Sequence, residues 1–184
     1  KIQKTKTNPS IMLLVFVFIS LLCECLAWWG HGHLLVAEIA VAHLNKTAPD
    51  VLDVAFKMVA EYQDFFPKTK NFVPSAAWSD NLHSQDFRLL AEWHYNDRPW
   101  QVDENLPPLP PANPSNMIWA LESCIKGISS PKLTPWAASF YIRWINHLIG
   151  DLHQPLHNIA QYSSNFPDGQ GDRGGNECKL SPIA

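Results

Sequence analysis

A histidine and an aspartate, His147 and Asp151, lie four residues apart near the end of an amphipathic segment. This spacing places both side chains on one helix face, where an imidazole and a carboxylate can bind the same metal ion. Most isolated pairs of this kind form only an ordinary hydrogen bond, so the pair alone leaves both interpretations open. An aromatic stripe of Trp136, Phe140 and Trp144 precedes it. Because that stripe should be buried, the carboxylate also needs a buried partner, and a metal ion is one of the few that suffice.

The segment from Thr134 to His157 carries the start and stop signals of one long helix. Thr134 can cap the free N–H groups, and Pro135 suits the first helical position. At about 100° per residue, the aromatic stripe and the His/Asp pair fall within roughly 80° of arc. Pro155 ends the helix, and His157 follows in the turn beyond it. The sequence therefore predicts a helix whose apolar face ends in metal-binding side chains.

The remaining chain predicts an all-α fold, because no strand pattern of useful length is present. Four further helices are expected, at about residues 34–44, 49–62, 74–82 and 115–128. We expect an extended stretch at Trp93–Tyr95. A stiff loop with five prolines is expected at 106–114, and a loop rich in Gly, Asp, Ser and Asn at 161–176.

The first 27 residues have the composition of a secretory signal peptide. Lysines precede an apolar run at 11–22, which is too short to cross a membrane, and small residues end the segment at Ala27. We expect cleavage after Ala27, which leaves a domain of residues 28–184 with Trp28 at its N-terminus. The mature protein would be secreted, or lie in the lumen of the secretory or lysosomal pathway, without membrane attachment.

The predicted mature chain is acidic. Removing three lysines and one glutamate from 14 basic and 17 acidic residues leaves a net charge of −5. No basic patch indicates nucleic-acid binding, so a phosphodiester substrate would need positive charge from metal ions. Asn45-Lys46-Thr47 is an N-glycosylation sequon, and Cys124 and Cys178 can pair in an oxidising compartment, although the sequence does not decide whether they do.

Six side chains are candidate ligands with the nitrogen and oxygen donors that zinc accepts. Each is ambiguous alone: His33 could cap its helix, Asp80 could pair with a lysine, and His94 could be a core histidine. The set is His33, Asp80, His94, His147, Asp151 and His157.

The order of motifs around these residues makes a resemblance visible. The motifs are Trp28 with Gly32-His33, Trp78-Ser79-Asp80, Trp93-His94-Tyr95, the run from His147 through Gly150-Asp151-Leu-His-Gln-Pro-Leu-His157, and Asp172-Arg-Gly-Gly-Asn176. In this order they resemble the trinuclear zinc nucleases of the S1/P1 type, which are secreted single-strand-specific nucleases with 3′-nucleotidase activity. Bacterial zinc phospholipase C shares that fold. The resemblance covers Trp28 to about Asn176 and implies a helical domain of this kind.

The resemblance also implies roles for the candidate ligands. One zinc ion would be bound by the free α-amine and carbonyl of Trp28 and by His33, and Asp151 would bridge it to a second. The other ligands of the second zinc would be Asp80, His94 and His147. His157 would bind a third zinc. No such role is implied for the other histidines, His31, His43, His83 and His153.

The sequence departs from the family pattern after Asn176. S1/P1 nucleases continue with a histidine and an aspartate that complete the third zinc site, and neither occurs between Glu177 and Ala184. We therefore expect a domain that is incomplete at its C-terminus and binds two or fewer zinc ions.

The reaction implied is metal-assisted hydrolysis of single-stranded DNA and RNA to 5′-mononucleotides by a monomer, with Asp80 and Asp151 as catalytic residues. Asp80 would orient the attacking water, and Asp151 would be shared by two zinc ions. Two alternatives stay open at this stage. One is a phospholipase C-like phosphodiesterase, and the other is an inactive zinc-binding remnant.

Overall fold

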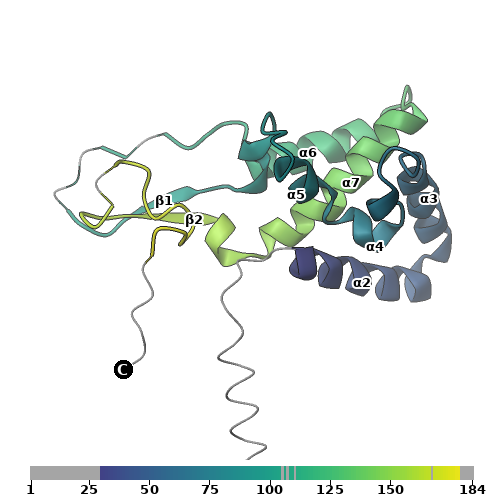
Figure 1. The fold of residues 1–184 in the computed structure, drawn as a ribbon, viewed down its shortest axis with the longest axis horizontal. Coiled ribbons are helices and arrows are strands. Elements are labelled where there is room, and N and C mark those ends of the chain that lie inside the picture. The colour runs from purple at the N-terminus through teal and green to yellow at the C-terminus, as the bar shows by residue number, and fades with distance from the viewer. Residues whose placement is uncertain (1–29, 105, 107, 110, 167, 179–184) are drawn as a thin grey trace, which may run out of the picture.

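The computed structural model describes residues 30–178 except 105, 107, 110 and 167, and within this range the fold is mostly helical (Figure 1). The α-helices are α2 (Gly30–Thr47), α3 (Pro49–Ala60), α4 (Phe72–Ser75), α5 (Trp78–His83), α6 (Met117–Ile128) and α7 (Pro135–Leu152). Short 3-10 helices are η1 (Pro67–Thr69), η2 (Ala91–His94) and η3 (Pro155–His157), and the strands are β1 (Arg98–Gln101) and β2 (Ile159–Tyr162). The all-α class predicted from the sequence is confirmed.

Helix α7 is the element against which the other helices pack. It begins as predicted, because the Thr134 side chain accepts a hydrogen bond from the backbone N–H of Ala137 at 3.3 Å and Pro135 occupies the first turn. Helices α2, α3, α4, α5 and α6 all contact it. In Figure 1, α7 runs through the helical part of the molecule between α6 and α2. Side chains on different faces of α7 therefore meet different parts of the chain.

The apolar core lies on both sides of α7. One cluster gathers Tyr62, Trp78, Met117, Ala120, Leu121, Cys124, Trp144 and Leu148. A smaller cluster on the side of α2 and α3 gathers Ala37, Ala55, Val59, Phe72 and Ala76. The expectation that the whole aromatic stripe is buried is wrong at its first residue: Trp136 is 60% exposed, whereas Trp144 is 2% exposed. Trp136 lies in the first turn of α7, where it stacks on Phe140 at the edge of the core.

Three local predictions need correction. Trp93 and His94 belong to the 3-10 helix η2, and only Tyr95 is extended. The expected helix at 74–82 is interrupted, because α4 ends at Ser75 and α5 begins at Trp78. The described residues include two strands, although none was expected. Each has only four residues, too few for an alternating pattern to be recognised.

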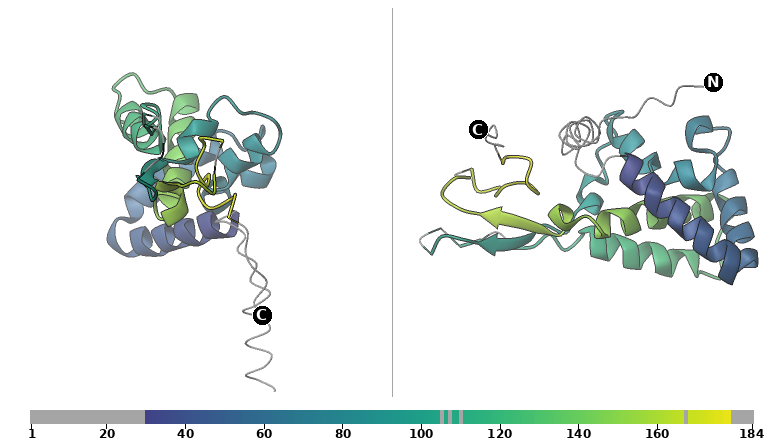
Figure 2. Two further views of the ribbon diagram at one scale, coloured as in Figure 1. Left: turned by 90° about the vertical axis from the view of Figure 1, so that its left-hand side faces the viewer. Right: turned by 90° about the horizontal axis from the view of Figure 1, so that it is seen from below.

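The strands form a parallel pair, with Arg98 opposite Ile159 and Gln101 opposite Tyr162. They are far apart in sequence, so their pairing depends on how the helices fold. Figures 1 and 2 show the pair extending away from the helical part, with the loop that follows β2 folded back beside it. The first two residues of the loop expected at 161–176 belong to β2, so the loop begins after Tyr162.

The pairing of Cys124 with Cys178, which the sequence left open, is not formed: both are free thiols, Cys124 buried and Cys178 exposed. The predicted signal peptide, residues 1–27, lies outside the described residues. Among the helices that are described, none has the length and apolar character that a bilayer crossing requires.

Candidate metal centre

Five of the predicted ligands converge at one place in the helical part. Helix α2 supplies His33, α5 supplies Asp80, the end of η2 supplies His94, and α7 supplies His147 and Asp151. His33, His147 and Asp151 are almost fully buried, at 1%, 0% and 1% exposure. Asp80 is the accessible member, with 37% of its side chain exposed, and it also lines a surface pocket with His31 and His83. Four separate segments thus meet at a buried set of nitrogen and oxygen donors.

One side of the centre consists of two imidazole nitrogens and two carboxylate oxygens. His147 Nε2 lies 2.9 Å from His94 Nδ1 and 3.0 Å from Asp151 Oδ2. His94 Nδ1 lies 3.4 Å from the same Asp151 oxygen and 3.6 Å from Asp80 Oδ1. His147 Nε2 is also 3.6 Å from Asp80 Oδ1. A tetrahedral zinc ion holds its N and O ligands about 3.3 Å apart, so the separations among His94, His147 and Asp151 suit such an ion, and these three residues form one candidate metal group.

The other side of the centre is formed around His33. Its Nε2 lies 3.2 Å from Asp151 Oδ1 and 3.7 Å from Asp80 Oδ2. Each carboxylate therefore faces His33 with one oxygen and the His94/His147 pair with the other. The imidazole rings of His33 and His147 stack with centroids 3.9 Å apart. The geometry assigns to Asp80 the same shared position that the sequence analysis gave to Asp151 alone.

A backbone carbonyl fixes the proton arrangement of His147. Its Nδ1 lies 2.6 Å from Ala76 O. This carbonyl is free to accept a hydrogen bond because Ala76 lies between the end of α4 and the start of α5. With the Nδ1 proton donated to Ala76, Nε2 of the neutral ring presents a lone pair to the centre. Metal-binding histidines are held in this way, through a hydrogen bond from the other ring nitrogen.

The electrostatics of the centre call for a cation. Burial alone would raise the pKa of Asp151, but the surrounding imidazoles, His147 first and then His33 and His94, hold that pKa far below its usual range, so the carboxylate is ionised. Asp151 Oδ2 and His33 Nδ1 are buried without a well-formed hydrogen bond. Lone pairs of Asp151 Oδ2 and His147 Nε2 face each other at 3.0 Å. A cation between such donors removes their repulsion, and the N and O donor set fits zinc.

Gly150 is required for this packing. A Cβ atom at Gly150 would lie 2.4 Å from His33 Nδ1, a distance that no real contact allows. The His33 ring therefore reaches the centre by lying directly on the backbone of α7. Sequence reasoning did not single out Gly150, although a glycine inside a helix is unfavourable and signals a close approach.

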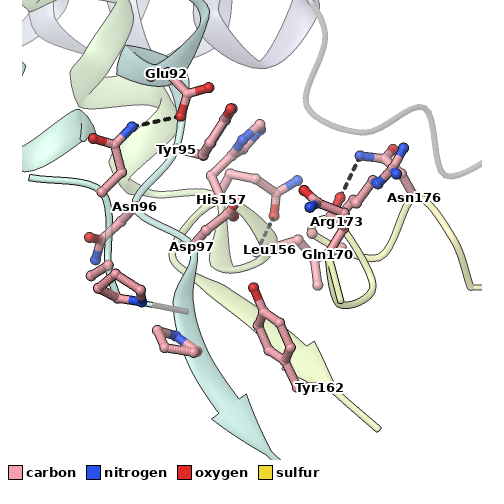
Figure 3. Close-up of a pocket in the computed structure, with 16 residues that line it drawn as sticks. Glu92, Tyr95, Asn96, Asp97, Leu156, His157, Tyr162, Gln170, Arg173 and Asn176 are labelled. Atoms are coloured by element: carbon pink, nitrogen blue, oxygen red, sulfur yellow. Dashed lines mark hydrogen bonds between the residues drawn. The ribbon is translucent and has the colours of Figure 1, made fainter. Parts of the chain in front are cut away.

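His157 is not part of this cluster. It lines a pocket of about 440 Å³ at the strand-and-loop end, which we define as residues 95–116 and 153–178. Figure 3 shows His157 beside Tyr95, with Arg173 and Asn176 elsewhere on the pocket wall. Burial lowers the pKa of His157, while the negative charge of Asp151 opposes that effect. Among the described residues, no candidate metal group of three or more donors contains His157.

Two glycines bring the following loop against η3, which contains His157. Gly174 has a φ of +65°, and a Cβ atom there would lie 2.6 Å from Leu156 O. Gly175 has a φ of +81° and packs on the Leu156 side chain. Only glycine adopts this backbone with this approach at no cost, which explains the pair in the motif. The loop holds Arg173 and Asn176 in the pocket wall.

The other sequence assignments have varied outcomes. Trp28, the expected N-terminal ligand, lies outside the described residues. His153 is exposed, and its Nδ1 lies 2.7 Å from Ile149 O, in keeping with a structural side chain. His83, for which no role was expected, stacks against His94 with ring centroids 6.0 Å apart. Its position one turn after Asp80 is the only sequence signal for this contact.

Comparison with known proteins gives one result. The family model described as S1/P1 Nuclease matches residues 28–182 of the chain. No curated protein and no solved structure gives a significant match.

Proposed function

Because the chain belongs to the S1/P1 nuclease family, we propose that it is a zinc-dependent endonuclease. The proposed reaction is hydrolysis of single-stranded DNA and RNA to 5′-mononucleotides, with 3′-nucleotidase activity. The observation that carries the proposal is the buried centre in which three histidines and two shared aspartates converge. Family membership and this donor set together indicate a metal-dependent nuclease, and the finer activity is our proposal.

The residues of such a site would have different roles. His33, His94 and His147 would hold zinc with neutral nitrogens, and Asp151 would be shared between two ions. Bound zinc supplies positive charge for the phosphate and lowers the pKa of water. Asp80 is the accessible carboxylate. It can accept a proton from an attacking water and so orient the lone pair of that water toward phosphorus.

The pocket at the strand-and-loop end suits a nucleotide. Its volume of about 440 Å³ lies within the range of small-molecule sites, and its wall carries tyrosine rings, amides and a guanidinium. Tyr95 and Tyr162 offer faces for stacking a base, and Asn176 offers hydrogen bonds to a base edge. A base must leave a duplex stack to enter such a pocket, which would favour single strands.

The test is cleavage of a labelled single-stranded oligonucleotide by the zinc-loaded protein, with chelator and phosphatidylcholine controls. We expect chelator-sensitive cleavage that zinc restores, and no hydrolysis of phosphatidylcholine. Asp151→Asn keeps the shape of the side chain and removes its charge. It should lower activity by more than the ~10- to 100-fold typical of outer-shell changes, and should also lower zinc per chain. His43→Asn, an exposed histidine of the same helix as His33, is the matched control.

Three outcomes would contradict the proposal. Zinc binding without any cleavage would favour the inactive zinc-binding protein. Preference for phosphatidylcholine would favour the phospholipase C-like enzyme. Full activity of Asp151→Asn would remove the centre from the mechanism.

Secretion is proposed on sequence grounds together with the exposure of Asn45 and Thr47 at the end of α2. N-terminal sequencing of the secreted protein checks cleavage after Ala27.

A further inference from the structure

Three neighbouring polar side chains of α7 bond to a row of backbone carbonyls in residues 59–76. Arg143 Nη2 donates to Val59 O at 3.0 Å, and its Nη1 donates to Thr69 O at 2.9 Å. Asn146 Nδ2 donates to Phe72 O at 2.8 Å. His147 Nδ1 completes the row on Ala76 O. We call Arg143, Asn146, His147 and their four carbonyl partners the carbonyl seam.

Burying the charged guanidinium of Arg143 in the carbonyl seam is energetically unfavourable. It is fully buried, and none of the ion pairs among the described residues includes it. Its remaining contacts are the Thr69 and Ser139 hydroxyls and the rings of Tyr62 and Trp78, 5.3 and 5.7 Å from the guanidinium carbon. Burial lowers the pKa of Arg143 to about 10.

An apolar side chain of similar volume would avoid the cost of burying a charge, but it would leave the buried carbonyls of Val59 and Thr69 without the hydrogen bonds that Arg143 donates. The guanidinium therefore supplies two buried carbonyls with hydrogen bonds that an apolar side chain could not donate. What the guanidinium adds is direction, because its fork holds Val59 at the end of α3 and Thr69 in η1 at fixed positions along α7.

The segment held by the seam leads directly to Asp80. After Ala76 the chain enters α5, where Trp78 packs against Trp144 of α7 and Asp80 faces the metal centre. Among the described residues, the polar contacts of the Asp80 carboxylate are the other members of the centre, His33, His94 and His147. The position of Asp80 relative to α7 therefore depends on how the preceding backbone, residues 59–76, is held.

We propose that Arg143 and Asn146 are positioning residues, which place Asp80 against the ligands that α7 carries. This inference rests on the proposed zinc site but adds two residues that touch neither metal nor substrate. His147 belongs to both sets, so the same helix turn binds the metal and anchors the segment that supplies the opposing carboxylate. Loss of Arg143 or Asn146 should therefore alter the metal site as removal of Asp80 does, without deleting a ligand.

The test uses cobalt(II) in place of zinc, because its visible absorption reports the number and geometry of ligands. The variants are Arg143→Met and Asn146→Leu, with Asp80→Asn as the reference for a lost carboxylate. Leu121→Ala is the matched control, since it makes a cavity in the core between α6 and α7 away from the seam. Spectra and affinities are measured at a temperature where circular dichroism shows each variant folded.

We expect both seam variants to bind cobalt about 10- to 100-fold more weakly than the wild type, with spectra shifted toward that of Asp80→Asn. Leu121→Ala should lose thermal stability and keep the wild-type spectrum. Wild-type spectra and affinity in both seam variants would overturn the inference, as would an equal change in Leu121→Ala. If Arg143→Met does not fold, Asn146→Leu alone decides. A wild-type protein that binds neither cobalt nor zinc would overturn the zinc site, and the inference with it.

Discussion

The helical part, residues 30–94 and 117–152, and the strand-and-loop end, residues 95–116 and 153–178, build the site in different ways. In the helical part, His33, His147 and Asp151 are buried and held by packing and backbone hydrogen bonds. At the strand-and-loop end, His157 lies in η3, just after the end of α7, and lines a pocket whose residues come mainly from loops. The single motif from His147 to His157 spans both.

This difference suggests a division of tasks. A buried centre on helices can hold donors within tenths of an ångström, as catalysis at a metal requires. A pocket made of loops offers varied hydrogen bonds and ring faces, as binding of a flexible substrate requires. Changes in the helical part should therefore act first on metal content, and changes at the strand-and-loop end should act first on substrate affinity.

The largest effect is expected from Gly150→Ala. The added methyl group would meet the His33 ring at 2.4 Å, and neither buried partner can move away. We expect a loss of zinc affinity of at least ~10- to 100-fold with a parallel loss of nuclease activity, measured by zinc analysis and oligonucleotide cleavage. Gly30→Ala is the control, since its Cβ would lie 3.8 Å from the nearest atom, an ordinary contact. Normal zinc content in Gly150→Ala would break the distinction between the two regions.

A smaller effect, on the other region, is expected from Gly174→Ala. The new Cβ would lie 2.6 Å from Leu156 O, so the loop with Arg173 and Asn176 would move from the pocket wall. We expect KM for a single-stranded substrate to rise about 10-fold, with zinc content and kcat little changed.

Gly169→Ala separates backbone strain from this clash. Gly169 has a comparable φ of +74°, but nothing lies within 4 Å of its Cβ position. The control should therefore share the strain and keep the wild-type KM. Zinc loss in Gly174→Ala would show that the loop belongs to the metal centre after all.

The smallest effect concerns stability at the pocket. Burial, with the nearby charges of Asp172 and Glu92, raises the pKa of Asp97 to about 6 from an ordinary 3.8. The folded state thus binds the proton of the Asp97 carboxyl more tightly than the unfolded chain does. Ionised Asp97 therefore lowers the free energy of unfolding above pH 6, and this destabilisation disappears as the pH falls toward 4. Asp97→Asn should raise the free energy of unfolding by about 1–2 kcal/mol at pH 7.5 and by little at pH 4.

Chemical denaturation at the two pH values measures this difference. Asp86→Asn is the matched control, because Asp86 also has a positive φ but its side chain is 90% exposed. A pH-independent gain in Asp97→Asn would contradict the assignment of the cost to charge burial.

Much of the fold was predictable because the main helices carry local signals. The cap at Thr134, the proline at 135 and the four-residue spacing of His147 and Asp151 depend on a single turn of backbone. The family resemblance was likewise visible in the order of short motifs, and the family match over residues 28–182 confirms it. The strands at 98–101 and 159–162 were missed because four residues give too short a pattern.

The sequence by itself determined a set of candidate metal ligands and that two of them, His147 and Asp151, share a helix face. Only the tertiary structure decided how the carboxylates are shared, with Asp80 turning one oxygen to His33 and the other to His94 and His147. It also decided that Gly150 makes room for His33 and that Arg143 is buried against backbone carbonyls. The physical reason is the range of the interactions. Helix signals act over a few residues, whereas most of these contacts join segments far apart in the chain, such as His147 and Ala76, which are 71 residues apart. Their meeting depends on the whole core.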